Sequence, residues 1–393
     1  MDRFGNKVTC NPKIKINKNE PIRLLPMEDI DPIYKYAEGS EESVFDGQGG
    51  VKFSSGDILM ARITPCLENG KIAIANTGKL KGVGSTEYFV FRGIKGVSDT
   101  NYIYYLLNTE YMRQMAVNSM TGASGRQRAD LGFIQRIKWD FPDYEEQKRI
   151  ASLISPFDDL VSINTKKIQT LQEVLNELFR EWFTRFRFPG YRTSAFVEGI
   201  PENWHTIRIG DICSFVSRGI TPDYVDEGVI VLNQKCVRNG KVSFEPSRMT
   251  DSSKKYKKEK ILQFGDTLIN STGTGTLGRT AIYYYSKKTV TVDGHVSIVR
   301  ADNPLYSFFV GLYMRNIETY IENLGKGSTN QIELSSNDIR RIKVTIPKED
   351  NLLIAFNDIA DNIFNQIRVL EEKNSNLIIQ RNAAATRLIL PKG

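Results

Sequence analysis

The feature that most constrains this chain is an internal duplication. GDIL at residues 56–59 recurs as GDTL at residues 265–268. FIQRIKWDFP, which starts at Phe133, recurs as DIRRIKVTIP, which starts at Asp338. Self-similarity at one long spacing, with the matched segments in the same order, is typical of a repeated structural unit. The 393 residues are therefore predicted to fold as two copies of one plan.

Each copy begins with short strand-like runs. DILMARI and KIAIA in the first half, and DTLINS and TAIYYY in the second, are rich in β-branched or aromatic residues and are separated by Gly, Asn and Pro. Helical stretches follow at Asn101 and at Ser307. This order predicts the α/β (α+β) fold class, with two mixed globules of roughly 140 residues each.

A long helical segment follows each globule. Its apolar residues alternate by four and three, which is the 3.5-residue repeat of a coiled coil. The first stripe consists of Ile150, Ile154, Phe157, Val161, Asn164, Ile168, Leu171, Leu175, Leu178 and Trp182, and the second of Phe356, Ala360, Ile363, Ile367, Leu370, Asn374, Leu377, Ala384 and Leu388. At ~1.5 Å per residue the first helix, from about Glu145 to Phe186, is expected to be roughly 60 Å long. Pro156 is expected to kink it near its start.

The connections favour antiparallel packing of these two helices. The linker FPGYRTSAFVEGIPENW joins the end of the first helix to the second globule, so a packed second helix must begin near where the first ends. We expect a pseudo-two-fold repeat with one globule at each end of the helix pair. Asn164 and Asn374 are expected to set the register by pairing with each other or with another polar group; the alternative is that both are solvated. The expected boundaries are 1–143 and 189–347 for the globules, the latter with its linker, and 144–188 and 348–393 for the helical regions.

This order of segments resembles the specificity subunit of a type I restriction-modification system. The resemblance covers essentially the whole chain. It rests on EEQKRIA before the first helix, ELFREWFTRF at its end, IPENWHTIRIGDI from Ile200 and the tail RNAAATRLILPKG. Two departures are evident. The first copy lacks the Pro-x-x-Trp lead-in of the second, and the EEQ segment of the first copy corresponds to EDNLL, from Glu349, in the second.

The resemblance implies a non-enzymatic subunit that reads double-stranded DNA through two target-recognition domains. The expected target is bipartite and asymmetric, with an unread gap set by the helices. The implied partners are two methylation subunits and endonuclease/translocase subunits, which would carry S-adenosylmethionine, ATP and Mg, so that this chain itself needs no cofactor and no metal. The candidate docking residues are Glu146, Gln147, Trp182, Phe183 and Phe186. The three aromatic residues have an alternative role, which is to seal the helix against its globule.

Four polar, basic loops are the candidate DNA-reading segments. They are residues 61–71 and 121–128 in the first copy, and residues 271–279 and 325–331 in the second. Paired donors and acceptors on Arg, Lys, Asn and Gln can read base edges, and cations can hold phosphate. The candidate DNA-binding residues are Arg62, Lys71, Ser124, Arg126, Gln127, Arg128, Thr274, Thr276, Arg279, Lys326, Thr329, Asn330 and Gln331. For each of them a solvated loop position is the alternative.

Two motifs suggest enzymes, and we interpret both as structural. Residues 273–278 match G-x-G-x-x-G, but RTAIYYY follows and predicts a returning strand instead of the helix that a dinucleotide site needs. Asp143 with Glu146 and Lys148 imitates a metal nuclease site, yet Asp143 is better placed as a helix N-cap. His295, beside Asp293, is expected to be a hydrogen-bonded structural residue.

Composition adds weaker limits. The net charge of +7 fits a polyanion partner without identifying one. The four cysteines form no C-x-x-C pair and are expected to be buried reduced thiols. No stretch is long enough to span a membrane and the start lacks an apolar signal core, so a cytoplasmic location is expected. The rival functions are a recognition subunit of another methylase-linked system, a nucleotide-cofactor enzyme using residues 273–278, and a plain coiled-coil scaffold.

Overall fold

The computed structural model describes residues 1–393 apart from residues 40, 124, 253–256, 286–288, 328–331 and 391–393. Its contacts divide the chain into two compact units. Unit 1 comprises Met1–Lys167 and Leu370–Gly393, and unit 2 comprises Ile168–Val369. Each of the two long helices therefore gives one part to each unit. Among the described residues, no helix combines the length and the apolar character needed to cross a membrane.

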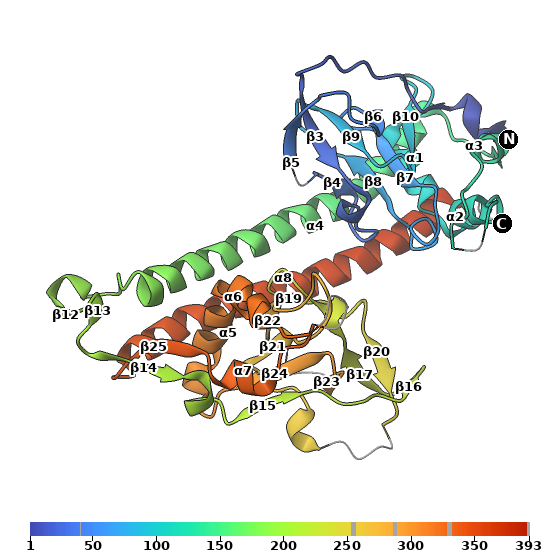
Figure 1. Ribbon diagram of the computed structural model, residues 1–393. Helices are drawn as coiled ribbons and strands as arrows, with labels where there is room; N and C mark the ends of the chain where they lie inside the picture. The colour runs from blue at the N-terminus through green and yellow to red at the C-terminus, as the bar shows by residue number, and fades with distance from the viewer. Residues whose placement is uncertain (40, 124, 253–256, 286–288, 328–331, 391–393) are drawn as a thin grey trace. The chain divides into compact units, whose positions relative to one another are not determined.

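Unit 1 is built around two larger sheets (Figure 1). One sheet has the order β2 (Val8–Cys10), β10 (Tyr88–Gly93), β7 (Ile58–Ala61), β8 (Ile72–Ala75) and β4 (Tyr36–Ala37). The other has the order β5 (Glu41–Val44), β3 (Pro21–Leu25), β9 (Lys81–Gly84) and β6 (Val51–Phe53). The short helices are α1 (Thr100–Leu107), α2 (Glu110–Asn118) and α3 (Leu131–Arg136). Every residue of β7 and β8 is buried, because both faces of these central strands are covered.

Unit 2 repeats this arrangement. Its first sheet has the order β15 (Phe215–Arg218), β24 (Val296–Arg300), β21 (Asp266–Asn270) and β22 (Thr280–Tyr283). Its second has the order β16 (Tyr224–Val225), β20 (Arg248–Thr250), β17 (Val229–Leu232) and β23 (Val290–Val292). The helices are α5 (Ser307–Asn316), α6 (Glu318–Asn323) and α7 (Ser336–Arg340). The parallel pair of β3 with β9 has its counterpart in β17 with β23, so the predicted duplication extends to strand order and direction.

The missing lead-in of the first copy shortens one ladder. In unit 2, β14 (Trp204–Arg208) pairs with β25 (Lys343–Pro347) over its whole length. In unit 1, β1 (Asp2–Arg3) pairs with β11 (Lys138–Trp139). The first copy therefore keeps this antiparallel pair in an abbreviated form.

The glycine-rich segment is a hairpin tip, as predicted. β21 and β22 are antiparallel neighbours on either side of it. Gly278 has a φ of +86°, and a Cβ atom there would lie 2.8 Å from the backbone N of Glu322. Glycine is needed because the hairpin adopts a left-handed conformation close to the α6 backbone. The segment therefore lacks the helix that a dinucleotide site requires.

Both long helices follow their predicted stripes. α4 (Tyr144–Phe179) continues through Pro156 and ends in a π-helical turn at Arg180–Thr184. α8 spans Asn351–Ile389. In unit 1, Asn374 accepts a hydrogen bond from Asn164 at 2.9 Å, and Arg381 contacts Asp158 at 2.8 Å. Because the higher number on α8 meets the lower number on α4, the two segments run antiparallel, and the predicted asparagine pair is confirmed.

A buried polar network lies beside this helix pair in unit 1. Lys35 is 2% exposed, and its ammonium donates to Ser155 Oγ at 3.0 Å and to the Tyr105 hydroxyl at 3.3 Å. Tyr105 donates in turn to Asp158 Oδ2 at 2.6 Å. Asp158 also accepts from Arg381, which donates to the Ile33 carbonyl as well. The network joins the globule of unit 1 to both helices.

An aromatic cluster takes the corresponding role in unit 2. Phe183 lies 5.0 Å from both Phe309 and Phe356 between ring centroids, and Phe179 lies 5.4 Å from Phe309. Phe179, Phe309 and Phe356 are fully buried. The cluster packs the end of α4 and the start of α8 against α5.

The cysteine prediction is half right. All four thiols are free, as expected. Cys213 and Cys236 are buried, but Cys10 and Cys66 are only partly buried. The difference arises because the first two lie in the hydrophobic interior of unit 2, whereas the other two lie at the margin of the unit 1 core.

Candidate nucleic-acid interface

Two of the predicted DNA-reading segments meet in unit 1. The tip between β7 and β8 and the loop between α2 and α3 are joined by backbone hydrogen bonds. Ala129 N donates to Arg62 O at 2.8 Å, and Thr64 N donates to Gln127 O at 3.0 Å. Gln127 N donates to the Thr64 hydroxyl at 3.1 Å. We call this crossing the unit 1 junction, and define it by residues 61–71, 87, 121–123 and 125–129.

The same crossing recurs in unit 2. Leu334 N donates to Ser271 O at 2.9 Å, which matches the bond from Ala129 to Arg62. Isolated bridges pair Thr272 with Glu333 and Lys326 with Glu333, where unit 1 has Ile63 with Arg128 and Thr121 with Arg128. We call this crossing the unit 2 junction, and define it by residues 271–279, 295, 325–327 and 332–334. The sequence predicted the four loops separately, and the structure brings them together in two equivalent pairs.

Ion pairs dominate the unit 1 junction. Arg128 donates to Glu87 from Nη2 at 2.6 Å and from Nε at 3.0 Å. This pairing with Arg128 holds the pKa of Glu87 below its ordinary value of 4.5. Arg62 Nε lies 3.7 Å from the same carboxylate, and its guanidinium lies 5.1 Å from the Phe89 ring centroid. Two cations thus share one anion, which leaves a net positive charge at the junction.

The unit 2 junction has different chemistry at the same positions. His295 occupies the position of Glu87, and its Nδ1 lies 2.8 Å from the Thr272 hydroxyl. Its backbone N donates to Asp293 Oδ1 at 2.9 Å, which agrees with the structural role expected for this histidine. Arg218 pairs with Glu333 at 3.3 Å. The structure therefore supports one backbone plan with two sets of side chains.

Several predicted DNA-binding residues are engaged within the chain. Lys71 donates to the Met27 carbonyl at 2.7 Å, and Arg279 donates to the Gly275 carbonyl at 2.7 Å. Thr276 donates to backbone carbonyls of its own tip. Lys326 pairs with Asp338 at 3.0 Å but stays 76% exposed. Lys71 thus supports its tip, while the exposed end of Lys326 remains accessible to a ligand.

The other predicted positions divide into two groups. Arg126 and Thr274 are exposed at their loops, and Gln127 is partly exposed. Ser124, Thr329, Asn330 and Gln331 lie outside the described residues. Neither their contacts nor a DNA contact by any of the other residues is tested by the structure, so direct readout stays a prediction.

Burial argues against part of the predicted docking set. Gln147 is 1% exposed, and its amide binds the backbone of Asp99, Val97 and Pro142. Its amide therefore makes its hydrogen bonds inside unit 1. The Glu146 carboxylate pairs with Arg149, and Glu146 N donates to Asp143 Oδ1 at 2.8 Å. Asp143 is thus an N-cap, as predicted.

The aromatic end of α4 is also largely internal. Trp182 and Phe183 are 9% and 6% exposed within the aromatic cluster. Phe186 is partly exposed and lies 5.1 Å from the Trp204 ring. These contacts favour the alternative role, in which the three residues seal the helix against its globule.

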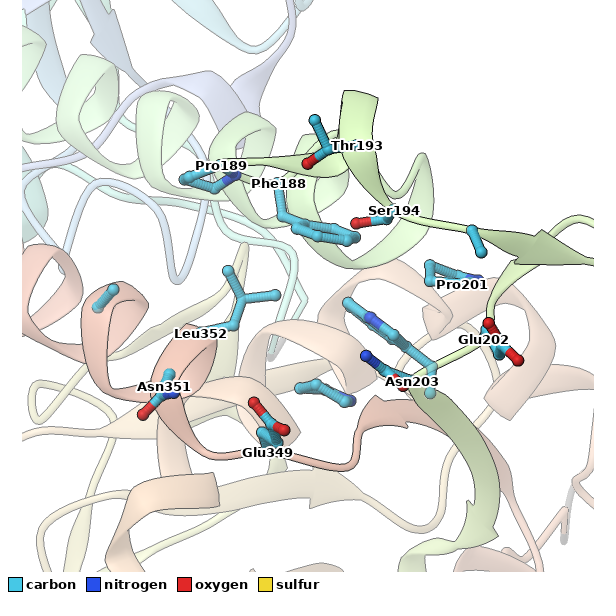
Figure 2. A pocket seen from close by; sticks show the side chains of 14 residues that line it. Phe188, Pro189, Thr193, Ser194, Pro201, Glu202, Asn203, Glu349, Asn351 and Leu352 are labelled. Atoms are coloured by element: carbon cyan, nitrogen blue, oxygen red, sulfur yellow. The ribbon is translucent and has the colours of Figure 1, made fainter.

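A separate pocket of about 480 Å³ lies in unit 2 (Figure 2). It is formed by the linker after α4, the start of β14 and the first turn of α8. Phe188 stacks on Trp204 at 5.5 Å, and Leu352 faces the same space. No predicted DNA-binding residue lines it, so it is distinct from the unit 2 junction. Nor do the described residues bring three metal-ligating side chains together anywhere.

Comparison with known protein families decides the affiliation of the chain. The family described as "Type I restriction modification DNA specificity domain" matches residues 13–173 and again residues 201–379. The chain belongs to this family. The two matches of the specificity domain coincide with the duplication, and each contains one of the junctions.

Individual relatives are named as specificity subunits. The chain is 30% identical over 210 residues to the "Type I restriction enzyme EcoEI specificity subunit" of Escherichia coli, over 51% of this chain and 33% of that protein. It is 25% identical over 356 residues to the "Putative type I restriction enzyme MjaX specificity subunit" of Methanocaldococcus jannaschii, over 88% of this chain and 77% of that protein. The matched part of the chain thus spans about a third of the length of the Escherichia coli relative.

A solved structure of the specificity type has the same fold. The crystal structure of the type I restriction-modification S subunit from M. genitalium matches with a TM-score of 0.55 and 15% sequence identity. The match covers 100% of this chain and 96% of that chain. It supports the fold of a specificity subunit, and the expected resemblance is confirmed by the family match.

Proposed function

We propose that the chain is the DNA-recognition subunit of a type I restriction-modification complex. Each unit reads one part of a bipartite, asymmetric duplex target through its junction. The chain has no catalytic role and serves as the scaffold for two methylation subunits and for endonuclease/translocase subunits. S-adenosylmethionine, ATP and Mg belong to those partner chains.

One observation carries this proposal: the two junctions share a backbone plan but differ in side chains. Loops on a rigid framework can change what they bind without changing the fold. A guanidinium-rich junction and a junction with hydroxyl and imidazole groups present different donors and acceptors, so they should select different bases. An asymmetric bipartite target follows from two such readers in one chain.

Co-expression with the partner methylation subunit tests the proposal, with modified adenines mapped across the host genome. We expect a split motif that depends on this chain. Replacing residues 61–71 and 121–128 with their unit 2 counterparts should change one half of the motif and leave the other half intact. A plain scaffold predicts no change of motif after the exchange. The absence of any chain-dependent motif would contradict the recognition function itself.

A further inference from the structure

Glu87 is a junction residue that lies directly before β10 and between two arginines from different loops. Its carbonyl accepts from Arg62 N at 2.9 Å, which fixes its position on the backbone. Its carboxylate is 23% exposed and lies within reach of both Arg62 and Arg128.

Arg128 is held firmly by this carboxylate. Its Nε lies 3.1 Å and 3.0 Å from the two oxygens of Glu87, and its Nη2 lies 2.6 Å from Oε1. Its Nη1 reaches the Arg126 carbonyl at 3.4 Å. Three of its nitrogens thus have acceptors within the chain, so Arg128 acts as a brace between the loop and β10.

The Arg62 guanidinium is held in place, but its N–H groups lack hydrogen-bond acceptors among the described residues. Its Nε is shielded from water and has no hydrogen-bond partner among the described residues, since the Glu87 oxygen is 3.7 Å away. Phe89 supports the guanidinium at 5.1 Å. No hydrogen bond from Nη1 or Nη2 to a described residue is found, and the side chain is 35% exposed. These two nitrogens are the ones available to a ligand.

We propose that Glu87 is a positioning residue that fixes Arg62 for two-pronged recognition of a guanine in one half of the DNA target. Guanine presents two adjacent acceptors, O6 and N7, in the major groove, which match the arginine fork. A guanidinium held between a carboxylate and an aromatic ring is preorganised, so less side-chain entropy is lost on binding. The inference rests on the proposed recognition function.

Unit 2 lacks this arrangement. The positions of Arg62, Glu87 and Arg128 are taken there by Ser271, His295 and Glu333, and Ser271 is fully buried. The proposed guanine contact therefore belongs to one half of the target, and the other half provides an internal control within the same chain.

The test compares Arg62→Lys and Glu87→Gln with the wild-type chain, each co-expressed with the methylation subunit, by mapping modified adenines. Lysine keeps the charge of Arg62 but loses its fork. In both variants the preference for guanine at one position of one half-site should fall roughly 5- to 150-fold. This is the range expected for the loss of one bidentate contact. The other half-site should be unchanged, and His295→Gln should leave the guanine position intact.

The outcomes separate this inference from the function on which it rests. A wild-type half-site without a G·C pair, or an unchanged motif in both variants, overturns the inference while recognition stands. Uniformly weaker modification with an unchanged motif in Arg62→Lys assigns the residue to phosphate, which also overturns it. If Glu87→Gln lowers the unfolding temperature and abolishes modification, the variant has lost its fold. The guanine preference of Arg62→Lys then tests the inference by itself. The absence of a wild-type motif refutes the recognition function.

Discussion

Apolar side chains of both long helices enter the core of unit 1, and the contacts that distinguish the two parts of the helix pair are polar in unit 1 and aromatic in unit 2. In unit 1, Asn164 meets Asn374 and Asp158 meets Arg381, whereas in unit 2 Phe356 meets the rings of Phe179, Trp182 and Phe183. Hydrogen bonds and ion pairs are directional, so they penalise a shift of one helix along the other. Aromatic burial contributes more free energy but tolerates small shifts. We therefore expect the polar pairs of unit 1 to fix the register and the aromatic cluster of unit 2 to contribute more to the free energy of unfolding.

The largest effect is expected from Phe356→Ala in the aromatic cluster. Removing this fully buried ring leaves a cavity and should lower the free energy of unfolding by about 3–5 kcal/mol. Urea denaturation followed by circular dichroism measures the loss, and Phe356→Leu should cost less because it leaves a smaller void. If Phe356→Ala lowered the free energy of unfolding by less than Asn164→Ala does, the aromatic cluster would not be the more stabilising of the two contacts.

The buried ion pair of unit 1 should come next. Arg381 and Asp158 have side chains 12% and 1% exposed, so Arg381→Ala leaves a carboxylate buried without its main partner. We expect a loss of about 3–5 kcal/mol, at the lower end because the Tyr105 hydroxyl still donates to Asp158.

The matched control is the double variant Asp158→Asn with Arg381→Met. It removes both charges of the pair and should recover part of the stability, since neither member is left as an unpaired charge, although Lys35 loses the nearby Asp158 carboxylate. Equal losses in the single and double variants would show that the charges themselves are not what matters at this contact.

The asparagine pair should have a smaller effect on stability than on specificity of packing. Asn164→Ala leaves Asn374, which is 7% exposed, short of a partner and should cost about 1–2 kcal/mol. Changing both residues to leucine should leave the free energy of unfolding unchanged or raise it. Hydrogen exchange of the α4 and α8 amides then reports whether the register became less uniform. Unaltered exchange in the double variant would remove the register role from the comparison.

The smallest effect concerns Lys35 and pH. Burial lowers the pKa of Lys35 in the folded chain from its ordinary value of 10.5, while the nearby Asp158 opposes the shift. Between the folded and unfolded pKa values the unfolded chain binds more protons, so stability rises with pH in that window. Relative to Lys35→Met, the wild-type chain should gain stability as the pH rises toward 10.5. A difference between the two proteins that does not change with pH would exclude this linkage.

The sequence predicted those parts of the fold that depend on spacing. The duplication, the helical stripes, the asparagine pair and the glycine hairpin all follow from local periodicity or from matched order along the chain. The sequence did not predict the parallel pairing of β3 with β9. The two strands are far apart along the chain and share no pattern that would reveal the pairing. The shortened β1 ladder was signalled only by the missing lead-in.

The site was predicted less completely than the fold. The loops were identified by composition, but their crossing depends on tertiary hydrogen bonds such as Ala129 to Arg62. Lys71 was predicted to bind DNA and Gln147 to dock another subunit, and both donate instead to backbone carbonyls of this chain, which no local pattern reveals. Glu87 was missed as a site residue, although its match to His295 in the duplicated strand was the available signal.

The division of the two units has a consequence for synthesis of the chain. Unit 2 is one continuous segment, whereas unit 1 needs residues from Leu370 onward, including Ile389 in its core and Arg381 in its polar network. Domains generally fold as units while the chain emerges from the ribosome. Unit 2 can therefore complete its contacts first, whereas unit 1 cannot complete its own until all of unit 2 has been made. During that interval the apolar surface of unit 1 that packs on the end of α8 is uncovered, and we expect chaperones to bind the nascent chain there.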